Sequence, residues 1–170
     1  VVSDSEQLAE SILTRLPDER KEIELAHVQV FLSELWDRAA PSGPLKGSVE
    51  LHAGLVHPDD NLAGVLDSFL KKQLAELTPV HGGKAPMELL AAMISERYTK
   101  LQLDAGELES HFIKNGIHLP RPLPELLREL EQRRILRTLK AGEQTRFEIS
   151  HDVLARVVGQ NLTEEMKLRE

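Results

Sequence analysis

The stretch of residues 146–162 changes its pattern of apolar side chains once, and this change constrains the fold more than any other feature. Apolar and polar residues first alternate, with Phe147 and Ile149 on one side of the chain. That alternation predicts a β-strand with one buried face and with Glu148 on the polar face. A helical stripe then follows, formed by Leu154, Val157, Val158 and Leu162. The sequence therefore predicts a strand that leads directly into a helix.

Three residues at this junction have side chains suited to the start of a helix. Ser150 or Asp152 can cap the helix, and an acidic side chain in the first turn favours the positive end of the helix dipole. His151 lies where free backbone N–H groups point outward, which is a place suited to an anion. An imidazole there can donate a hydrogen bond to a phosphate. Position alone, however, favours the simpler interpretation that His151 packs at a strand–helix junction.

Composition favours helices and excludes several kinds of site. Aromatic residues make up only 4% of the 170 residues and charged residues 29%, so a leucine-rich core is expected to hold helices together. The absence of cysteine excludes disulfides, thiol nucleophiles and cysteine metal sites. No apolar run approaches the roughly 20 residues that span a bilayer. The net charge of −7 argues against general affinity for nucleic acids or anionic membranes. We expect a cytoplasmic location.

The first half of the chain has the pattern of a helical bundle. Apolar residues recur at helical spacing over residues 5–16, 22–39 and 62–77. In the second of these segments one wide face, which we expect to be buried, is formed by Val28, Phe31, Leu32, Leu35 and Trp36. Trp36 is interpreted as a packing anchor on this face.

The second half follows a segment rich in turn-forming residues, 78–86, in which two glycines stand between two prolines. The predicted order after it is helix, short extended strip, helix, helix and β-hairpin, which is the order of elements in a winged helix. Asp104 and Glu107 have the spacing of a capping box at the start of the second helix. Residues 135–149 have the pattern of the hairpin.

These patterns predict a mainly α chain, with a helical bundle followed by a winged-helix domain that carries a small β-hairpin. The expected boundaries are 1–79 for the helical domain, 80–85 for a linker, and 86–170 for the winged-helix domain with its C-terminal helix. Because the chain starts at Val1 and lacks an initiator methionine, we expect it to be a fragment of a longer protein.

A winged helix raises the alternative of a DNA-binding transcription regulator. The cations that could contact DNA lie on the predicted recognition helix, about residues 124–134, and in the wing: Arg128, Arg133, Arg134 and Lys140. Acidic residues on the same helix oppose this use, because they would meet phosphates and release no counterions: Glu125, Glu129 and Glu131. The charge pattern therefore argues against DNA as a partner, and DNA binding stays the alternative hypothesis.

Several local patterns, in the same order along nearly the whole chain, resemble the C-terminal half of a STAND-class NTPase, the signal-transducing branch of the AAA+-like ATPases. Residues 25–36 resemble the helix that opens the family's helical lid domain, and residues 62–77 resemble the long helix that follows it. Residues 123–139 and 146–156 resemble its winged-helix domain. Within the latter, Ile-Ser-His-Asp-Val-Leu at 149–154 resembles the family's "apolar–x–His–Asp" junction.

In that family the junction histidine contacts the β-phosphate of bound ADP and holds the resting state. The resemblance therefore implies that His151 senses the nucleotide, with Asp152 and Ser150 as its neighbours in the motif. Ala26 stands where the family usually has a proline that touches the adenine, so Ala26 and His27 are the nucleotide-proximal candidates of the first domain.

The resemblance also implies a partner that this sequence does not contain. No Gly-x-x-x-x-Gly-Lys-Ser/Thr loop is present, and Gly82-Gly83-Lys84 lacks its spaced glycines. The expected partner is an N-terminal nucleotide-binding core of the same protein, which would hold ADP or ATP with magnesium. Assembly into a homo-oligomer on activation is implied as well, and no membrane contact. For this chain by itself we predict no enzymatic activity, no catalytic residue and no cofactor.

A metal site is the last kind of chemistry that the sequence raises. His52 and His57 lie five residues apart and within reach of Asp59 and Asp60. Histidine pairs on a helix usually need a spacing of three or four residues to share a metal ion. We therefore predict no metal site.

Overall fold

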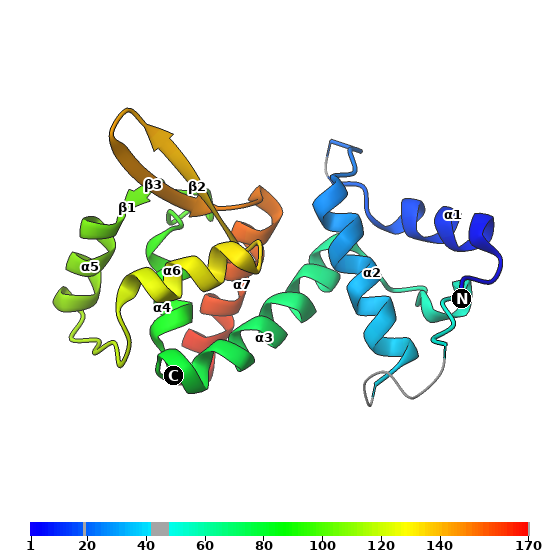
Figure 1. Ribbon diagram of the computed structural model, residues 1–170, viewed down its shortest axis with the longest axis horizontal. Helices are drawn as coiled ribbons and strands as arrows, with labels where there is room; N and C mark the ends of the chain where they lie inside the picture. Colours follow the sequence, from blue (N-terminus) through cyan, green and yellow to red (C-terminus); the bar gives the residue numbers. More distant parts are fainter. Residues whose placement is uncertain (19, 42–47, 170) are drawn as a thin grey trace. The chain divides into compact units, whose positions relative to one another are not determined.

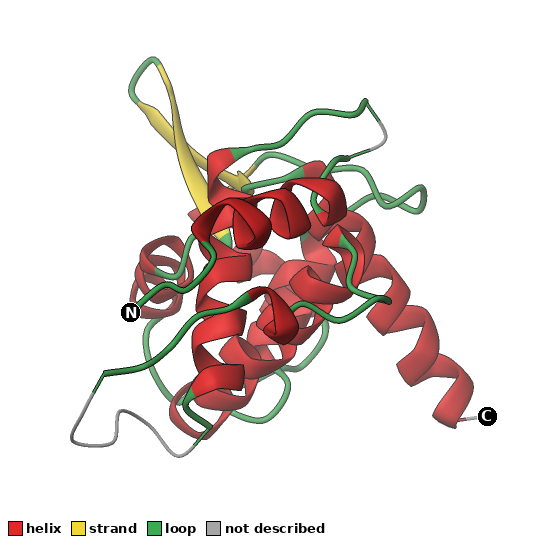
Figure 2. Cartoon of the chain, turned by 90° about the vertical axis from the view of Figure 1, so that its right-hand side faces the viewer, coloured by secondary structure: helices red, strands yellow, loops and turns green. Residues whose placement is uncertain are grey.

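The computed structural model describes residues 1–18, 20–41 and 48–169. It is mainly helical and contains a small three-stranded antiparallel sheet, which confirms the predicted fold class (Figure 1). The strands are confined to a hairpin and a short strand beside it (Figure 2). Within the described ranges, no helix is both long enough and apolar enough to cross a bilayer.

The chain divides into two compact units, Val1–Phe69 and Leu70–Glu170, and each is described by itself. The division falls inside helix α3, Leu62–His81, rather than in the segment 80–85 that the sequence pattern suggested as a linker. Turn-forming residues mark where a helix can end, whereas the extent of a compact unit depends on long-range contacts.

The first unit contains α1 (Ser5–Arg15), α2 (Leu25–Ala39), the short 3-10 helix η1 (Ala53–Leu55) and the start of α3. Both α1 and α2 contact η1. Its buried apolar side chains come from all three α-helices and from the residue after α1: Leu8, Ile12, Leu16, Phe31, Leu35, Leu62, Val65 and Leu66.

The buried face of α2 is narrower than the sequence pattern predicted. Phe31 and Leu35, one helical turn apart, are fully buried, but Leu32 and Trp36 are 38% and 44% exposed. The prediction of one wide buried face that includes these two residues is therefore wrong. At about 100° per residue, each of the two lies next to the buried stripe rather than in it. An apolar residue at the margin of a helix face is compatible with either environment, so sequence alone did not decide.

Arg38 of α2 fixes the connection between η1 and α3. Its guanidinium donates to both carboxylate oxygens of Asp60, at 2.6 and 2.9 Å, and to the carbonyl of Leu55 at 2.9 Å. Asp60 also accepts a hydrogen bond from the backbone N–H of His57. The hydrogen bonds from Arg38 hold the pKa of the Asp60 carboxyl below its usual value, against the opposing effect of partial burial.

Replacing Asp60 by asparagine is expected to lower the free energy of unfolding at pH 7 by about 1–3 kcal/mol, because a bidentate charged hydrogen bond is lost. Since the folded-state pKa lies below the unfolded value of about 3.9, the stabilisation is complete above that value. It disappears as the pH falls through the folded-state pKa. Urea denaturation, followed by the fluorescence of Trp36, the single tryptophan, measures both effects.

The neighbouring exposed acid provides the control for this prediction. Asp59→Asn removes the same charge one residue away. It should leave the urea midpoint of the unmodified chain unchanged within experimental error, both at pH 7 and at a pH below the folded-state pKa of Asp60. Equal stability of Asp60→Asn and Asp59→Asn at pH 7 would contradict the assigned role of the Arg38 ion pair.

The second unit contains the remainder of α3 and the winged-helix elements. These are α4 (Ala85–Ala92), β1 (Leu103–Asp104), α5 (Ala105–Lys114), α6 (Leu123–Gln132), β2 (Leu136–Ala141), β3 (Gln144–Ile149) and α7 (Asp152–Arg169). The sheet order is β1-β3-β2, with Leu103 opposite Phe147 and Leu136 opposite Ile149. Helix–strand–helix–helix–hairpin is the order that the sequence predicted.

Local signals placed the ends of these elements well. The capping box at the start of α5 is confirmed: an oxygen of Asp104 accepts from Glu107 N–H, and Glu107 accepts from Asp104 N–H, both at 2.8 Å. The predicted hairpin is confirmed as well, with Gly142 at its turn. The φ of this glycine is +65°, a conformation that favours a residue without a Cβ atom.

Helix α3 differs from the sequence prediction because it continues past Leu77 and through Pro79 to His81. Its last turn is held by long-range contacts: Leu77 is fully buried, and the ring of His81, 1% exposed, lies with Nε2 3.0 Å from an oxygen of Glu129 on α6. The helix ends at Gly82, where φ is +92°. Tertiary packing thus outweighs the cost of a proline near the helix end.

The core of the second unit is aliphatic, with one phenylalanine. Many of its buried residues come from α3, the four helices of the winged helix and β3, among them Leu70, Leu77, Leu89, Leu90, Leu108, Phe112, Leu126, Leu130, Ile149, Leu154 and Val158, and Met93 and Ile135 between these elements are buried as well. This core fixes where β3 ends and α7 begins.

Candidate functional site

The junction between β3 and α7 is held by hydrogen bonds to the end of α6. Ser150 N–H donates to the carbonyl of Ile135 at 2.9 Å, and the Ser150 hydroxyl donates to the carbonyl of Arg134 at 2.7 Å. Ser150 therefore anchors the chain one residue before His151. Arg134 presents its carbonyl from a backbone with φ +61°, directly after α6.

His151 occupies the position immediately before α7. Its carbonyl accepts the N–H of Ala155 at 3.1 Å, which is the first hydrogen bond of the helix. The His151 side chain is half-buried, neither enclosed in the apolar core nor fully in water. The backbone N–H groups in the first turn of α7 have no intrahelical acceptor, so the site combines an imidazole with the positive end of a helix. This donor set fits a phosphate.

The carboxylate at this helix start has its own counterion. Asp152 is 68% exposed, and its Oδ1 lies 3.3 Å from Nζ of Lys100. A negative charge in the first turn stabilises the helix but repels an approaching anion. The lysine offsets that repulsion. Sequence reasoning named Asp152 as a site residue but missed Lys100. Lys100 lies far from Asp152 in the sequence and belongs to no motif with it.

Lys100 belongs to a larger network around Glu148 of β3. This side chain is only 5% exposed, and its carboxylate accepts from Gln102 Nε2 at 3.0 Å and from Arg137 Nε at 2.5 Å, with Lys100 Nζ at 3.5 Å. Glu148, which the alternation places on the polar face of the strand, is therefore buried. The loop before β1 supplies Lys100 and Gln102 as polar partners, and β2 supplies Arg137.

The pKa of Glu148 reflects two opposing effects. Burial acts to raise it, but the hydrogen bonds from Gln102 and Arg137, together with the positive charges of Lys100 and Arg137, outweigh burial and lower it. The carboxylate is therefore ionised at neutral pH. A buried, charged carboxylate therefore lies on β3 shortly before His151. Its hydrogen bonds connect β3 with β2 and with the loop before β1.

Ala26 and His27, the other candidates near a nucleotide, lie on α2 in the first unit. Ala26 is half-buried and His27 is 1% exposed. Their assignment rests on the resemblance described above and stays a prediction.

The four cations considered for DNA binding differ in their surroundings. Arg133 is engaged within its unit, with NH1 2.5 Å from Oε1 of Gln73 and 2.6 Å from Oε2 of Glu76, both on α3. Arg134 contributes its carbonyl to Ser150. Arg128 and Lys140 are exposed on α6 and β2. The four cations therefore lie in different surroundings, and their assignment to DNA binding stays a prediction.

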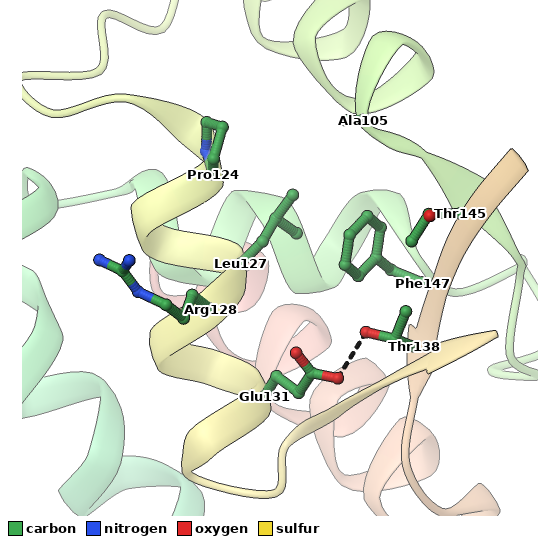
Figure 3. A pocket seen from close by; sticks show the side chains of 8 residues that line it. All are labelled: Ala105, Pro124, Leu127, Arg128, Glu131, Thr138, Thr145 and Phe147. Carbon is green, nitrogen blue, oxygen red and sulfur yellow. Dashed lines mark hydrogen bonds between the residues drawn. The ribbon is translucent and has the colours of Figure 1, made fainter. Parts of the chain in front are cut away.

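A groove of about 320 Å³ lies between α6 and the hairpin (Figure 3). Leu127 and Phe147 face each other across it, and Glu131 accepts a 2.5 Å hydrogen bond from the Thr138 hydroxyl at one end. The side chain of Arg128 points away from its centre. The remaining lining residues are Ala105, Pro124 and Thr145. Its apolar floor suits an aliphatic or aromatic group rather than a phosphate.

Comparison with known proteins adds no family assignment. No protein-family model, curated protein or solved structure matches the chain.

Proposed function

We propose that this chain is the regulatory helical and winged-helix module of a STAND-type signal-transduction ATPase. In this proposal His151 distinguishes ADP from ATP, and a nucleotide-binding core outside the present sequence holds the nucleotide with magnesium. The chain itself performs no hydrolysis. Its role is to make the population of the resting conformational state depend on whether ADP or ATP is bound.

The observation that carries the proposal is the geometry of the β3–α7 junction. Ser150 is anchored by two hydrogen bonds, α7 begins one residue after His151, and the imidazole between them is half-buried. A pre-positioned donor at a helix start costs little entropy when it binds an anion. The order of the winged-helix elements, which matches the order in the family that the sequence resembles, supports the proposal further.

A single contact of this kind is large enough to act as a switch. A hydrogen bond between a charged phosphate and an imidazole contributes about 1.5–3 kcal/mol, which corresponds to a change of roughly 10- to 150-fold in an equilibrium constant. The contact shifts the conformational balance only if it forms in one state and not in the other. The proposal therefore requires that His151 reach the diphosphate in the ADP-bound state and lose it in the ATP-bound state.

The test uses the natural protein that contains this chain together with its nucleotide-binding core. His151→Ala should accelerate dissociation of a fluorescent ADP analogue by about 10-fold or more, because the phosphate loses one donor. It should also raise the basal level of signalling or assembly, because the resting state is no longer favoured.

His118→Ala is the matched control. His118 is an exposed histidine in the loop before α6, and its removal should leave ADP dissociation unchanged. If His151→Ala releases ADP no faster than His118→Ala, or if the natural protein binds no adenine nucleotide, the proposed function is wrong.

A further inference from the structure

The loop of residues 94–100 is attached to α7 at two places. At its middle, the hydroxyls of Tyr98 and Thr163 lie 2.6 Å apart, and the Tyr98 ring lies against Gly159. At its end, Lys100 reaches Asp152. The loop is closed by backbone hydrogen bonds from Ser95 N–H to the Thr99 carbonyl and from Tyr98 N–H to the Ser95 carbonyl, both 2.9 Å. These hydrogen bonds fix the backbone from which the Lys100 side chain extends.

Lys100 bridges the two elements on either side of His151. Its Nζ lies 3.5 Å from Oε1 of Glu148, near the end of β3, and 3.3 Å from Oδ1 of Asp152, the first residue of α7. The side chains of Lys100 and Glu148 are 17% and 5% exposed, so solvent screens this pair less than it would screen a surface pair, whereas the Asp152 carboxylate is 68% exposed. The cation therefore holds the strand end and the helix start at a set separation.

We infer that Lys100 is a positioning residue for the nucleotide-sensing histidine, holding the β3 and α7 ends beside His151 and cancelling the Asp152 charge that would repel a diphosphate. This inference rests on the proposed function. It adds Lys100, which the junction motif does not contain. It also states that the Asp152 carboxylate would repel a phosphate and that Lys100 offsets this repulsion.

The side-chain charges at the start of α7 determine whether a diphosphate is attracted there or repelled. Without Lys100, an approaching phosphate would meet the Asp152 carboxylate in the first turn of α7. With it, the local side-chain charges of Lys100 and Asp152 cancel, which leaves the imidazole and the backbone N–H groups as the net attraction. Two effects therefore follow from one side chain, and they can be separated by mutation.

The experiment compares variants in the natural protein with its nucleotide-binding core. Lys100→Met should accelerate ADP dissociation by about 2- to 30-fold, the range expected for a residue that acts through another. Lys100→Arg should keep the dissociation rate close to that of the unmodified protein. Asp152→Asn introduced into Lys100→Met should restore part of the loss, because the repelling charge is then absent as well.

A second readout does not depend on nucleotide. Amide hydrogen exchange without ADP should become faster in Lys100→Met at residues 149–155 and stay unchanged in α5. Lys114→Met, which removes an exposed lysine at the end of α5, is the matched control and should change neither ADP dissociation nor exchange at the junction.

The outcomes separate the two proposals. If His151→Ala accelerates ADP release and Lys100→Met behaves like Lys114→Met, the inference about Lys100 is overturned and the proposed function stands. If Lys100→Arg is as impaired as Lys100→Met, and Asp152→Asn restores nothing, Lys100 is merely structural and the inference is again overturned. If His151→Ala has no effect, the proposed function itself fails.

Discussion

Replacing Gly159 by alanine is expected to destabilise the second unit by about 2–4 kcal/mol, although alanine normally stabilises a helix relative to glycine by about 1 kcal/mol. Gly159 lies within α7, and a Cβ atom there would stand 2.2, 2.4 and 2.7 Å from three ring atoms of Tyr98. The ring cannot yield easily, because its hydroxyl lies 2.6 Å from that of Thr163 and its backbone already has a φ of +59°. Urea denaturation followed by circular dichroism measures the effect.

Two further variants show whether the clash is the cause. Gly64→Ala changes an exposed glycine in α3, where the nearest neighbour of the new Cβ lies 3.4 Å away, and it should be neutral or slightly stabilising. In a Tyr98→Ala background, Gly159→Ala should no longer destabilise, since the space of the ring is free. If Gly159→Ala unfolds at the same urea concentration as the unmodified chain, the close approach of Tyr98 to α7 is wrong.

Glu148→Ala is the second change with a large expected effect, a loss of about 3 kcal/mol in the free energy of unfolding at neutral pH. The carboxylate accepts from Gln102 and Arg137 and faces Lys100. Removing it leaves the partly buried lysine without its buried partner and opens space under β3. Equilibrium denaturation of the full chain at pH 7 measures the loss.

Glu148→Gln separates charge from shape. The amide oxygen can still accept from Gln102 or Arg137, so this variant should lose only about half as much stability as Glu148→Ala. Glu143→Ala, an exposed acid in the hairpin turn, should stay within about 0.5 kcal/mol of the unmodified chain. A stability of Glu148→Ala equal to that of Glu143→Ala would rule out a structural role for the buried network.

The sequence predicted those features that depend on neighbours along the chain. The capping box needs only Asp104 and Glu107, and the hairpin needs two alternating segments around Gly142, so both are visible in a few consecutive residues. The step from β3 into α7 is local as well, and for that reason the position of His151 at a helix start was predictable.

The remaining features depend on residues far apart in the sequence. The last turn of α3 follows from the contact of His81 with Glu129, and the need for glycine at 159 follows from Tyr98. Glu148 has the alternation of an exposed residue, yet Lys100 and Gln102 enclose it from another segment. A pattern of polar and apolar residues records average environments. It carries no information on which distant side chain fills the space.

The sheet order β1-β3-β2 has a consequence for how the hairpin behaves among other molecules. Among the described strands, β2 pairs only with β3, so its outer backbone N–H and C=O groups are open to a strand from elsewhere. Lys140 on that strand is exposed, and Arg137, which donates to Glu148, still has 53% of its side chain exposed. A strand added at this edge would partly desolvate these cations. The free-energy cost of that desolvation opposes edge-to-edge pairing of β2 with another chain.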